Sequence, residues 1–117
     1  MSINQAVATA ALFTLTRGAD SNLPIPLLGN YPTPIAGFAH GYVNSLLTDN
    51  AFPTLWKGVY NGIYKNQEVT PLAHNVTRKT THAATSGLVQ VGLLYETTAN
   101  QPLQNFMVGA ISSLINF

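Results

Sequence analysis

The side chains that could carry out catalysis or bind a metal ion are few and scattered along this chain. His40, His74 and His82 are the three histidines, and there is no cysteine. His74 and His82 flank residues 75–79 with no carboxylate nearby in sequence, and their spacing does not match a zinc-binding motif. We expect these histidines to make hydrogen bonds at the surface or at an interface, and we predict no metal site and no cofactor.

The carboxylates and glycines give no catalytic pattern either. The four carboxylates, Asp20, Asp49, Glu68 and Glu96, are far apart in sequence, so nothing predicts a general acid–base pair. No glycine-rich loop leads into Lys-Ser or Lys-Thr, the pattern that binds nucleotide phosphates. We therefore expect a protein that is not an enzyme.

The one cluster of basic residues is Arg78-Lys79, which threonines and His82 flank. Because the net charge is only +1, one such cluster on an isolated molecule would attract nucleic acid weakly. In an assembly the cluster would be repeated in every copy, so we predict a weak contact with a nucleic-acid backbone through Arg78 and Lys79. The alternative is that both residues lie in a solvated loop.

Aromatic residues also recur at helical spacing. Phe52, Trp56, Tyr60 and Tyr64 form a stripe that is more typical of a core than of a ligand pocket. A small helical protein that binds a ligand or an apolar cofactor, with His40 or His74 as ligands, is the alternative interpretation of the same residues.

Charge is scarce throughout the chain. Only 8% of its 117 residues are charged and 46% are hydrophobic, whereas ordinary globular domains are about 25% charged. The remaining polar residues are mainly Asn, Thr, Gly and Ser, which a neighbouring subunit can cover without burying a charge.

The length fits one domain over residues 1–117. No basic region precedes an early apolar stretch and no uncharged apolar run reaches bilayer length, so we predict neither a signal peptide nor a membrane span.

Three segments repeat apolar residues at the spacing of one helix face. They cover residues 34–48, 52–66 and 101–117, and each has a proline in its first turn. Asp49-Asn50 separates the first two, so we expect an antiparallel hairpin or a sharp corner there. Residues 2–16 and 80–97 are two further expected helices, although residues 89–95 also alternate as a strand would.

The remaining segments are expected to be irregular. Residues 18–34 contain four prolines, which exclude a regular helix and suggest a strap laid over apolar surface. Residues 67–79, with Pro71, are expected to form a second loop. The sequence thus predicts an all-α fold, a small bundle of four to five short amphipathic helices with a proline-rich irregular strap. The alternative is an α+β fold with strands within residues 80–97.

A stripe of small residues runs beside each clear apolar stripe. Its members are Gly37, Gly41, Gly58, Gly62, Gly109, Ser112 and Ser113. Glycine inside a helix costs about 1 kcal/mol relative to alanine, and close approach of another backbone is the usual compensation. Because the helices have almost no charged face, we predict that these small residues pack against neighbouring subunits. Tight packing within one bundle is the alternative.

These features predict a structural subunit that assembles with copies of itself, such as a virus capsid or coat protein or a filament subunit, located in a virion or another large assembly. In composition and plan the chain resembles the small helical coat proteins of archaeal filamentous and spindle-shaped viruses. No motif matches that group residue by residue, so the resemblance assigns no functional residues. DNA-wrapping coats would also carry more basic residues.

Other classes of function fit the same sequence. One is an accessory subunit of a large hetero-oligomeric or membrane-associated complex, whose helix faces would meet different partners. Another is the small ligand- or cofactor-binding protein described above. A coat protein with a strand-rich middle and a C-terminal helix, as in small RNA phages, is a variant of the first prediction.

Overall fold

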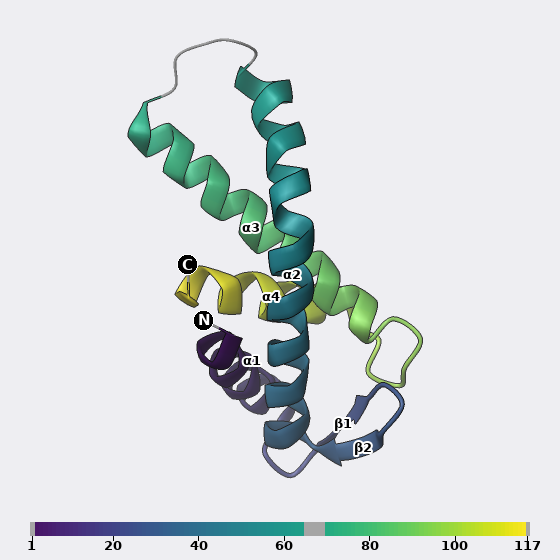
Figure 1. Cartoon of the computed structure of the whole chain (residues 1–117). Coiled ribbons are helices and arrows are strands. Elements are labelled where there is room, and N and C mark those ends of the chain that lie inside the picture. Colours follow the sequence, from purple (N-terminus) through teal and green to yellow (C-terminus); the bar gives the residue numbers. More distant parts are fainter. Residues whose placement is uncertain (1, 65–69, 117) are drawn as a thin grey trace.

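Helices dominate the computed structural model, which describes residues 2–64 and 70–116. The elements are α1 (Ser2–Arg17), β1 (Asn22–Ile25), β2 (Gly29–Pro32), α2 (Thr33–Tyr64), α3 (Pro71–Leu93) and α4 (Pro102–Asn116). The predicted all-α bundle is therefore confirmed, with a small two-stranded sheet added to it (Figure 1).

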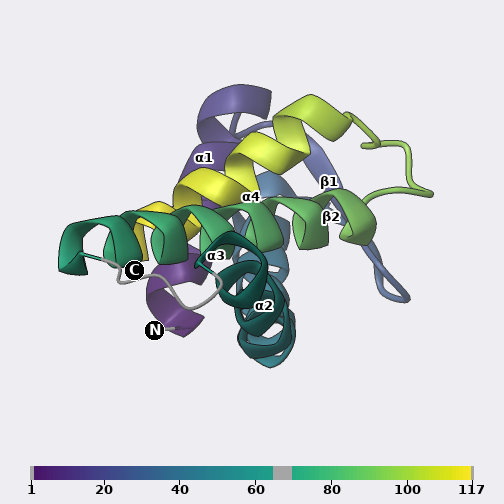
Figure 2. The same ribbon diagram turned by 90° about the horizontal axis from the view of Figure 1, so that it is seen from above.

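The four helices pack in a ring. The most extensive contacts pair α1 with α2 and α3 with α4, while α2 also packs on α3 and α1 on α4. Seen from above, α2 and α4 lie on opposite sides of α3 (Figure 2). Residues 53–64 and 70–81 extend beyond this body as a two-helix arm, in which none of the described residues is buried (Figure 1). The arm accounts for the elongated shape, with extents of 50 × 23 × 21 Å.

The predicted break between residues 34–48 and 52–66 is wrong, because α2 is one helix through Asp49-Asn50 and Pro53. Proline removes one helical hydrogen bond and crowds the preceding turn. Here Thr48 and Phe52 are both buried on the same face of α2, so tertiary packing holds the two halves in one register. The last two residues of the second segment lie outside the described residues.

Helix α3 begins earlier than predicted, so the loop expected over residues 67–79 is wrong for residues 71–79. Residues 67–69 lie outside the described residues. Thr70 is the N-cap, its hydroxyl accepting a hydrogen bond from the Ala73 N–H at 3.2 Å, and Pro71 occupies the first turn. The strand alternative is also wrong, because residues 80–93 are helical and residues 94–97 are turns and bends.

The proline-rich strap is a β-hairpin and not irregular, since β1 and β2 pair antiparallel with Leu23 opposite Tyr31. Leu23 is fully buried and anchors the hairpin in the small apolar cluster of the body. At the tip, Leu27 has a φ of 72° and a fully exposed side chain. A leucine in the left-handed region is strained, so this tip departs from ordinary turn chemistry.

Burial on α2 is the reverse of what is usual for a helix of a globular protein. Apart from Phe52, the buried residues of α2 are small or polar: Thr33, Ala36, Gly37, His40, Gly41, Asn44, Ser45 and Thr48. The exposed face carries large apolar ones: Ile35, Phe38, Tyr42, Val43, Leu46 and Leu47. The apolar cluster of the body is correspondingly small and centres on Phe13, Leu23 and Leu94. The chain therefore has a largely polar interior and apolar outer helix faces.

Glycines let the paired helices approach closely. A Cβ at Gly41 would lie 2.7 Å from Ala6 Cα and 2.6 Å from Thr9 Cβ, both on α1. A Cβ at Gly109 of α4 would lie 2.5 Å from the Ser86 carbonyl oxygen of α3. Both positions therefore require glycine for the observed helix spacing.

Replacing glycine by alanine at two positions of α2 should have opposite effects on stability. We expect Gly41→Ala to lower the free energy of unfolding by about 2 kcal/mol, because the added methyl group forces α1 and α2 apart. Gly58→Ala is the matched control, because a Cβ there meets nothing within 4 Å, and it should raise stability by about 0.5–1 kcal/mol. Urea unfolding measures both, and equal stability of the two variants would contradict the close approach.

Candidate functional site

The most connected group of side chains is a buried hydrogen-bond network centred on Asn44 of α2. The Asn44 amide donates to the Ser86 carbonyl oxygen at 2.9 Å and to Gln90 Oε1 at 3.1 Å, both on α3. Its oxygen accepts from the Thr48 hydroxyl at 2.8 Å and from Gln5 Nε2 of α1 at 3.3 Å. Asn44 is fully buried, so one amide side chain joins three helices in the interior of the bundle.

Ser86 extends this network to the fourth helix. Its hydroxyl lies 2.8 Å from the Gly109 carbonyl oxygen of α4 and 2.9 Å from Asn44 Oδ1, and it donates its one proton between these two acceptors. The same hydroxyl accepts from Gln5 Nε2 at 3.0 Å. All four helices are thus tied together by hydrogen bonds at one level of the bundle.

His40 ties the hairpin to the same network. Its Nε2 lies 2.7 Å from the Pro24 carbonyl oxygen, which can only accept, so Nε2 carries the proton. Its Nδ1 then accepts from the Gln90 amide at 3.4 Å. Burial lowers the pKa of His40 below its ordinary value of 6.5, and the positive charge of Arg17 adds to this, against the opposing hydrogen bond to Pro24. A neutral imidazole is therefore the form this site accommodates.

His82 occupies a second buried position, where α3 meets α2 and α4. Its Nδ1 forms a short hydrogen bond with the Ser113 hydroxyl of α4, and its Nε2 lies 3.9 Å from an Asp49 carboxylate oxygen. Phe52 packs edge-on against the imidazole with ring centroids 4.9 Å apart. Burial lowers the pKa of His82, Arg78 acts in the same direction, and Asp49 opposes both.

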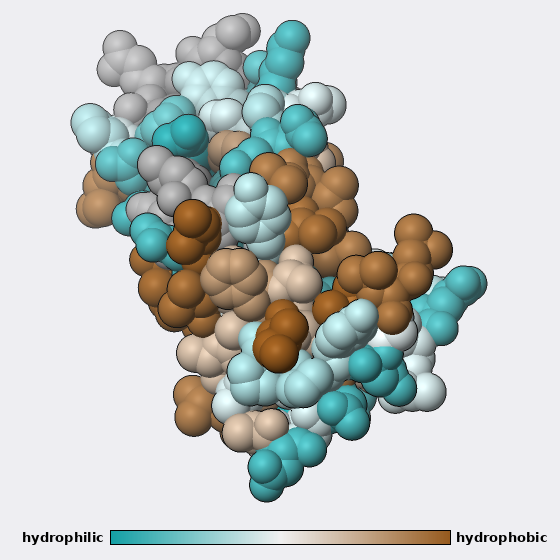
Figure 3. Space-filling model, turned by 60° about the horizontal axis from the view of Figure 1, so that its bottom comes forward, coloured by the Kyte–Doolittle hydropathy of each residue, from teal (hydrophilic) through white to brown (hydrophobic). Residues whose placement is uncertain are grey.

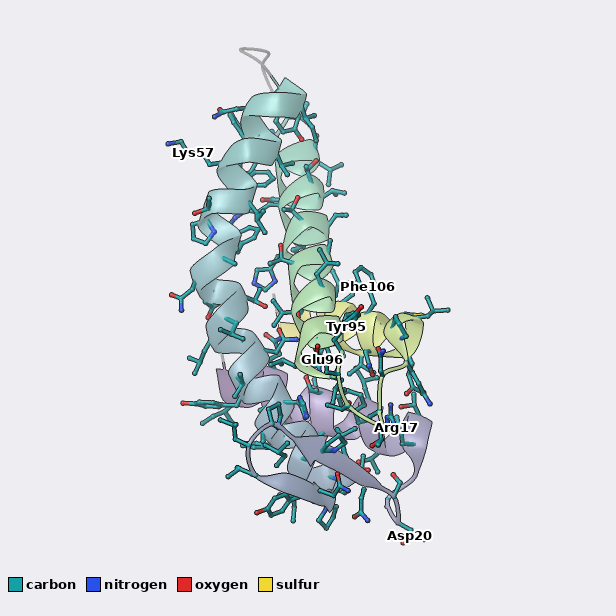
Figure 4. All side chains as sticks on the ribbon, turned by 90° about the vertical axis from the view of Figure 1, so that its right-hand side faces the viewer. Arg17, Asp20, Lys57, Tyr95, Glu96 and Phe106 are labelled. Carbon is teal, nitrogen blue, oxygen red and sulfur yellow. The ribbon has the colours of Figure 1, made fainter. Side chains whose placement is uncertain are left out.

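The arm is held together by rings from both of its helices. Trp56 and Tyr60 of α2 both pack edge-on against His74 of α3, with centroids 5.2 Å and 5.9 Å apart. The Arg78 guanidinium lies over the Phe52 ring at 5.7 Å. The aromatic stripe is therefore an interhelical contact. Lys57 projects outward from α2 (Figure 4).

The two residues predicted to contact phosphate, Arg78 and Lys79, are both exposed, but on helix α3 and not in a loop. Arg78 faces α2 through its ring contact. The contact of Arg78 and Lys79 with a nucleic-acid backbone stays a prediction.

The predicted small residues fall into two groups. Gly37, Gly41, Gly109, Ser112 and Ser113 are buried within the chain, where they contact its own helices. Gly58 and Gly62 lie exposed on the arm, and a Cβ at either would meet nothing within 4 Å. For the first group the close contacts lie within one subunit, so the surface available to another copy is elsewhere.

That available surface is apolar and has two prominent features. The first, which we call the α2 ridge, consists of Ile35, Phe38, Tyr42 and Leu46, each between 41% and 59% exposed. The second, the α1–α4 groove, is a hollow of about 310 Å³ lined by Leu12, Thr16, Leu103, Gln104, Met107, Val108 and Ile111. The view in Figure 3 shows several groups of hydrophobic residues on one face of the molecule.

No family model, curated protein or solved structure matches this chain. Among residues 2–64 and 70–116, no helix is long and apolar enough to span a bilayer. The same residues contain no group of three or more His, Asp or Glu side chains that could hold a metal ion.

The hydrogen-bond network was not predicted, although the sequence contains a signal for it. Polar residues stand four apart on α2, at His40, Asn44 and Thr48. A second such series stands on α3, at His82, Ser86 and Gln90. Two helices with polar residues at this spacing can pair those faces directly.

Asn44→Ala should strongly destabilise the chain. We expect a loss of about 3 kcal/mol or more, because the buried Gln90 oxygen, the Ser86 carbonyl and the Gln5 amide each lose a partner. Asn61→Ala on the exposed part of the same helix is the control and should change stability by less than about 0.5 kcal/mol. The measurement is chemical unfolding, and similar values for both variants would mean that the network contributes little.

Stability should fall as the pH drops below about 6.5, the ordinary histidine pKa. Since burial lowers the pKa of His40 and His82, the unfolded chain binds more protons than the folded chain below that pH. Protonation therefore favours unfolding. Thermal melts between pH 7.5 and pH 5 should show a decreasing midpoint, with a shallower decrease for His40→Gln. A midpoint that rises on acidification would contradict this assignment.

Proposed function

We propose that this chain is a structural subunit that assembles with copies of itself, such as a coat or filament subunit of a virion or another large assembly. The observation that carries the proposal is the reversed burial of α2, with polar residues inside and large apolar residues outside. Water-exposed apolar faces on every helix of a chain with so few charges are typical of surfaces that a partner covers.

The distribution of exposed apolar residues supports the proposal. Helix α1 exposes Ile3, Val7 and Leu15; α3 exposes Leu72, Val76 and Leu88; and α4 exposes Leu103, Met107, Ile111, Leu114 and Ile115. The accessible surface is 6927 Å², whereas a compact monomer of this mass exposes about 6,200 Å². A chain with more surface than usual and exposed apolar residues on every helix gains free energy by association.

The buried hydrogen-bond network supports the same proposal. Because Asn44, Ser86 and Gln90 find their partners within the chain, a single copy has a defined fold on which a lattice can be built. The apolar residues on the outer helix faces do not form the core of a single copy, so they can contact another copy. Arg78 and Lys79 would lie exposed in each copy, where a weak contact with a nucleic-acid backbone would be repeated along the assembly.

Purified protein should form large, regular homo-oligomers at micromolar concentration. Sedimentation velocity and negative-stain electron microscopy of the full chain test this directly. A monodisperse species of 12.5 kDa at all concentrations would overturn the proposal. Recovery of an ordered complex only together with a different protein, or only with lipid vesicles, would instead favour an accessory subunit of a hetero-oligomeric or membrane-associated complex.

A further inference from the structure

We infer that the α2 ridge of one copy inserts into the α1–α4 groove of the next copy, so that subunits join head to tail. This inference rests on the proposed self-assembly and adds the two surfaces and their order. The occupant of the groove is therefore a second copy of this chain.

The two surfaces lie on different parts of the molecule and do not overlap. The ridge belongs to α2, and the groove lies between α1 and α4. Helices α2 and α4 occupy opposite sides of α3 and have few contacts with each other (Figure 2). One copy can therefore use its ridge and its groove at the same time. A contact between two different surfaces of identical subunits is heterologous, and it generates a closed ring or an open filament.

The area available on the ridge side matches what a specific interface needs. Its four members and the flanking Val43 and Leu47 are 41–59% exposed, which corresponds to roughly 500 Å² of apolar side chain. A standard interface buries about 800 Å² on each partner, of which about 57% is apolar. The apolar part of such an interface is roughly 450 Å² per partner, so the ridge and its flanks are sufficient.

The chemistry of the two surfaces is also complementary. The described residues that make up the ridge and the groove carry no charge, so copies meet without repulsion or buried ions. Tyr42 supplies a hydroxyl in the middle of the ridge. Gln104 lines the groove, and its Oε1 has no hydrogen-bond partner within the described part of the chain. We assign the Tyr42 hydroxyl of one copy as the donor to this oxygen after a rotation of the Gln104 amide.

Two single substitutions separate this arrangement from other modes of association. Phe38→Glu places a charge on the ridge and leaves the groove intact, and Met107→Glu does the reverse. Each variant alone should remain monomeric at concentrations where the wild type assembles, with association at least 100-fold weaker, because the charge would be buried in an apolar contact. Leu72→Glu, on an exposed residue of the arm, is the control and should assemble like the wild type.

Mixing the two variants gives the decisive result. The intact ridge of Met107→Glu fits the intact groove of Phe38→Glu, so an equimolar mixture should form a heterodimer of twice 12.5 kDa that grows no further. Sedimentation velocity measures its mass. Assembly of Met107→Glu alone, or no heterodimer in the mixture of two folded variants, overturns the inference. A wild type that stays monomeric overturns the proposed function itself.

Two further measurements keep the test independent of folding defects. Far-ultraviolet circular dichroism should give wild-type helix content for each variant, and Leu46→Lys and Ile111→Lys replace any variant that does not. Tyr42→Phe removes only the hydroxyl and should weaken association roughly 2- to 10-fold, whereas Tyr31→Phe on the hairpin should have no effect. Equal association of Tyr42→Phe and wild type would overturn the assignment of the Gln104 contact.

Discussion

Asn44 brings two amide protons and an acceptor oxygen into a region that excludes water, and each must find a partner there. The partners come from α1, α3 and the next turn of α2, and Ser86 passes the connection to α4. The positions of four helices therefore depend on one amide. Gly41 and Gly109 are consequences of this arrangement, because hydrogen bonds between short side chains require helix backbones that lie close together.

A polar interior leaves the large apolar side chains of the same helices on the outside. When one face of an α-helix packs against the network, the residues on its opposite face point to solvent or to a partner. On α2 the two classes stand on opposite sides along four turns, with His40, Asn44 and Thr48 inside and Ile35, Tyr42 and Leu46 outside. The orientation of α2 is thus set by hydrogen bonds, and its hydrophobic residues are left for association.

Local signals in the sequence were sufficient for the fold class but not for the orientation of the helices. A proline in the first turn was expected at the start of residues 34–48, and Pro71 stands in the first turn of α3 in the same way. In the sequence that single proline favoured a loop. Asp49-Asn50 resembled a helix end because the tertiary contacts that bury Thr48 and Phe52 on either side of it cannot be read from the sequence. Whether the small stripe or the apolar stripe of a helix faces inward depends on the helices packed against it. The sequence therefore predicted that Gly37 and Ser113 pack closely, but not that they pack within the chain.

The small apolar cluster around Phe13, Leu23 and Leu94 has a thermodynamic consequence. The heat-capacity change of unfolding comes mainly from newly exposed apolar surface, and this chain already exposes much of its apolar surface when folded. Its stability curve should therefore be broad and shallow for a domain of this size. Covering the outer helix faces would transfer that heat-capacity change to association. Temperature would then control the assembled state more strongly than the fold of a single copy.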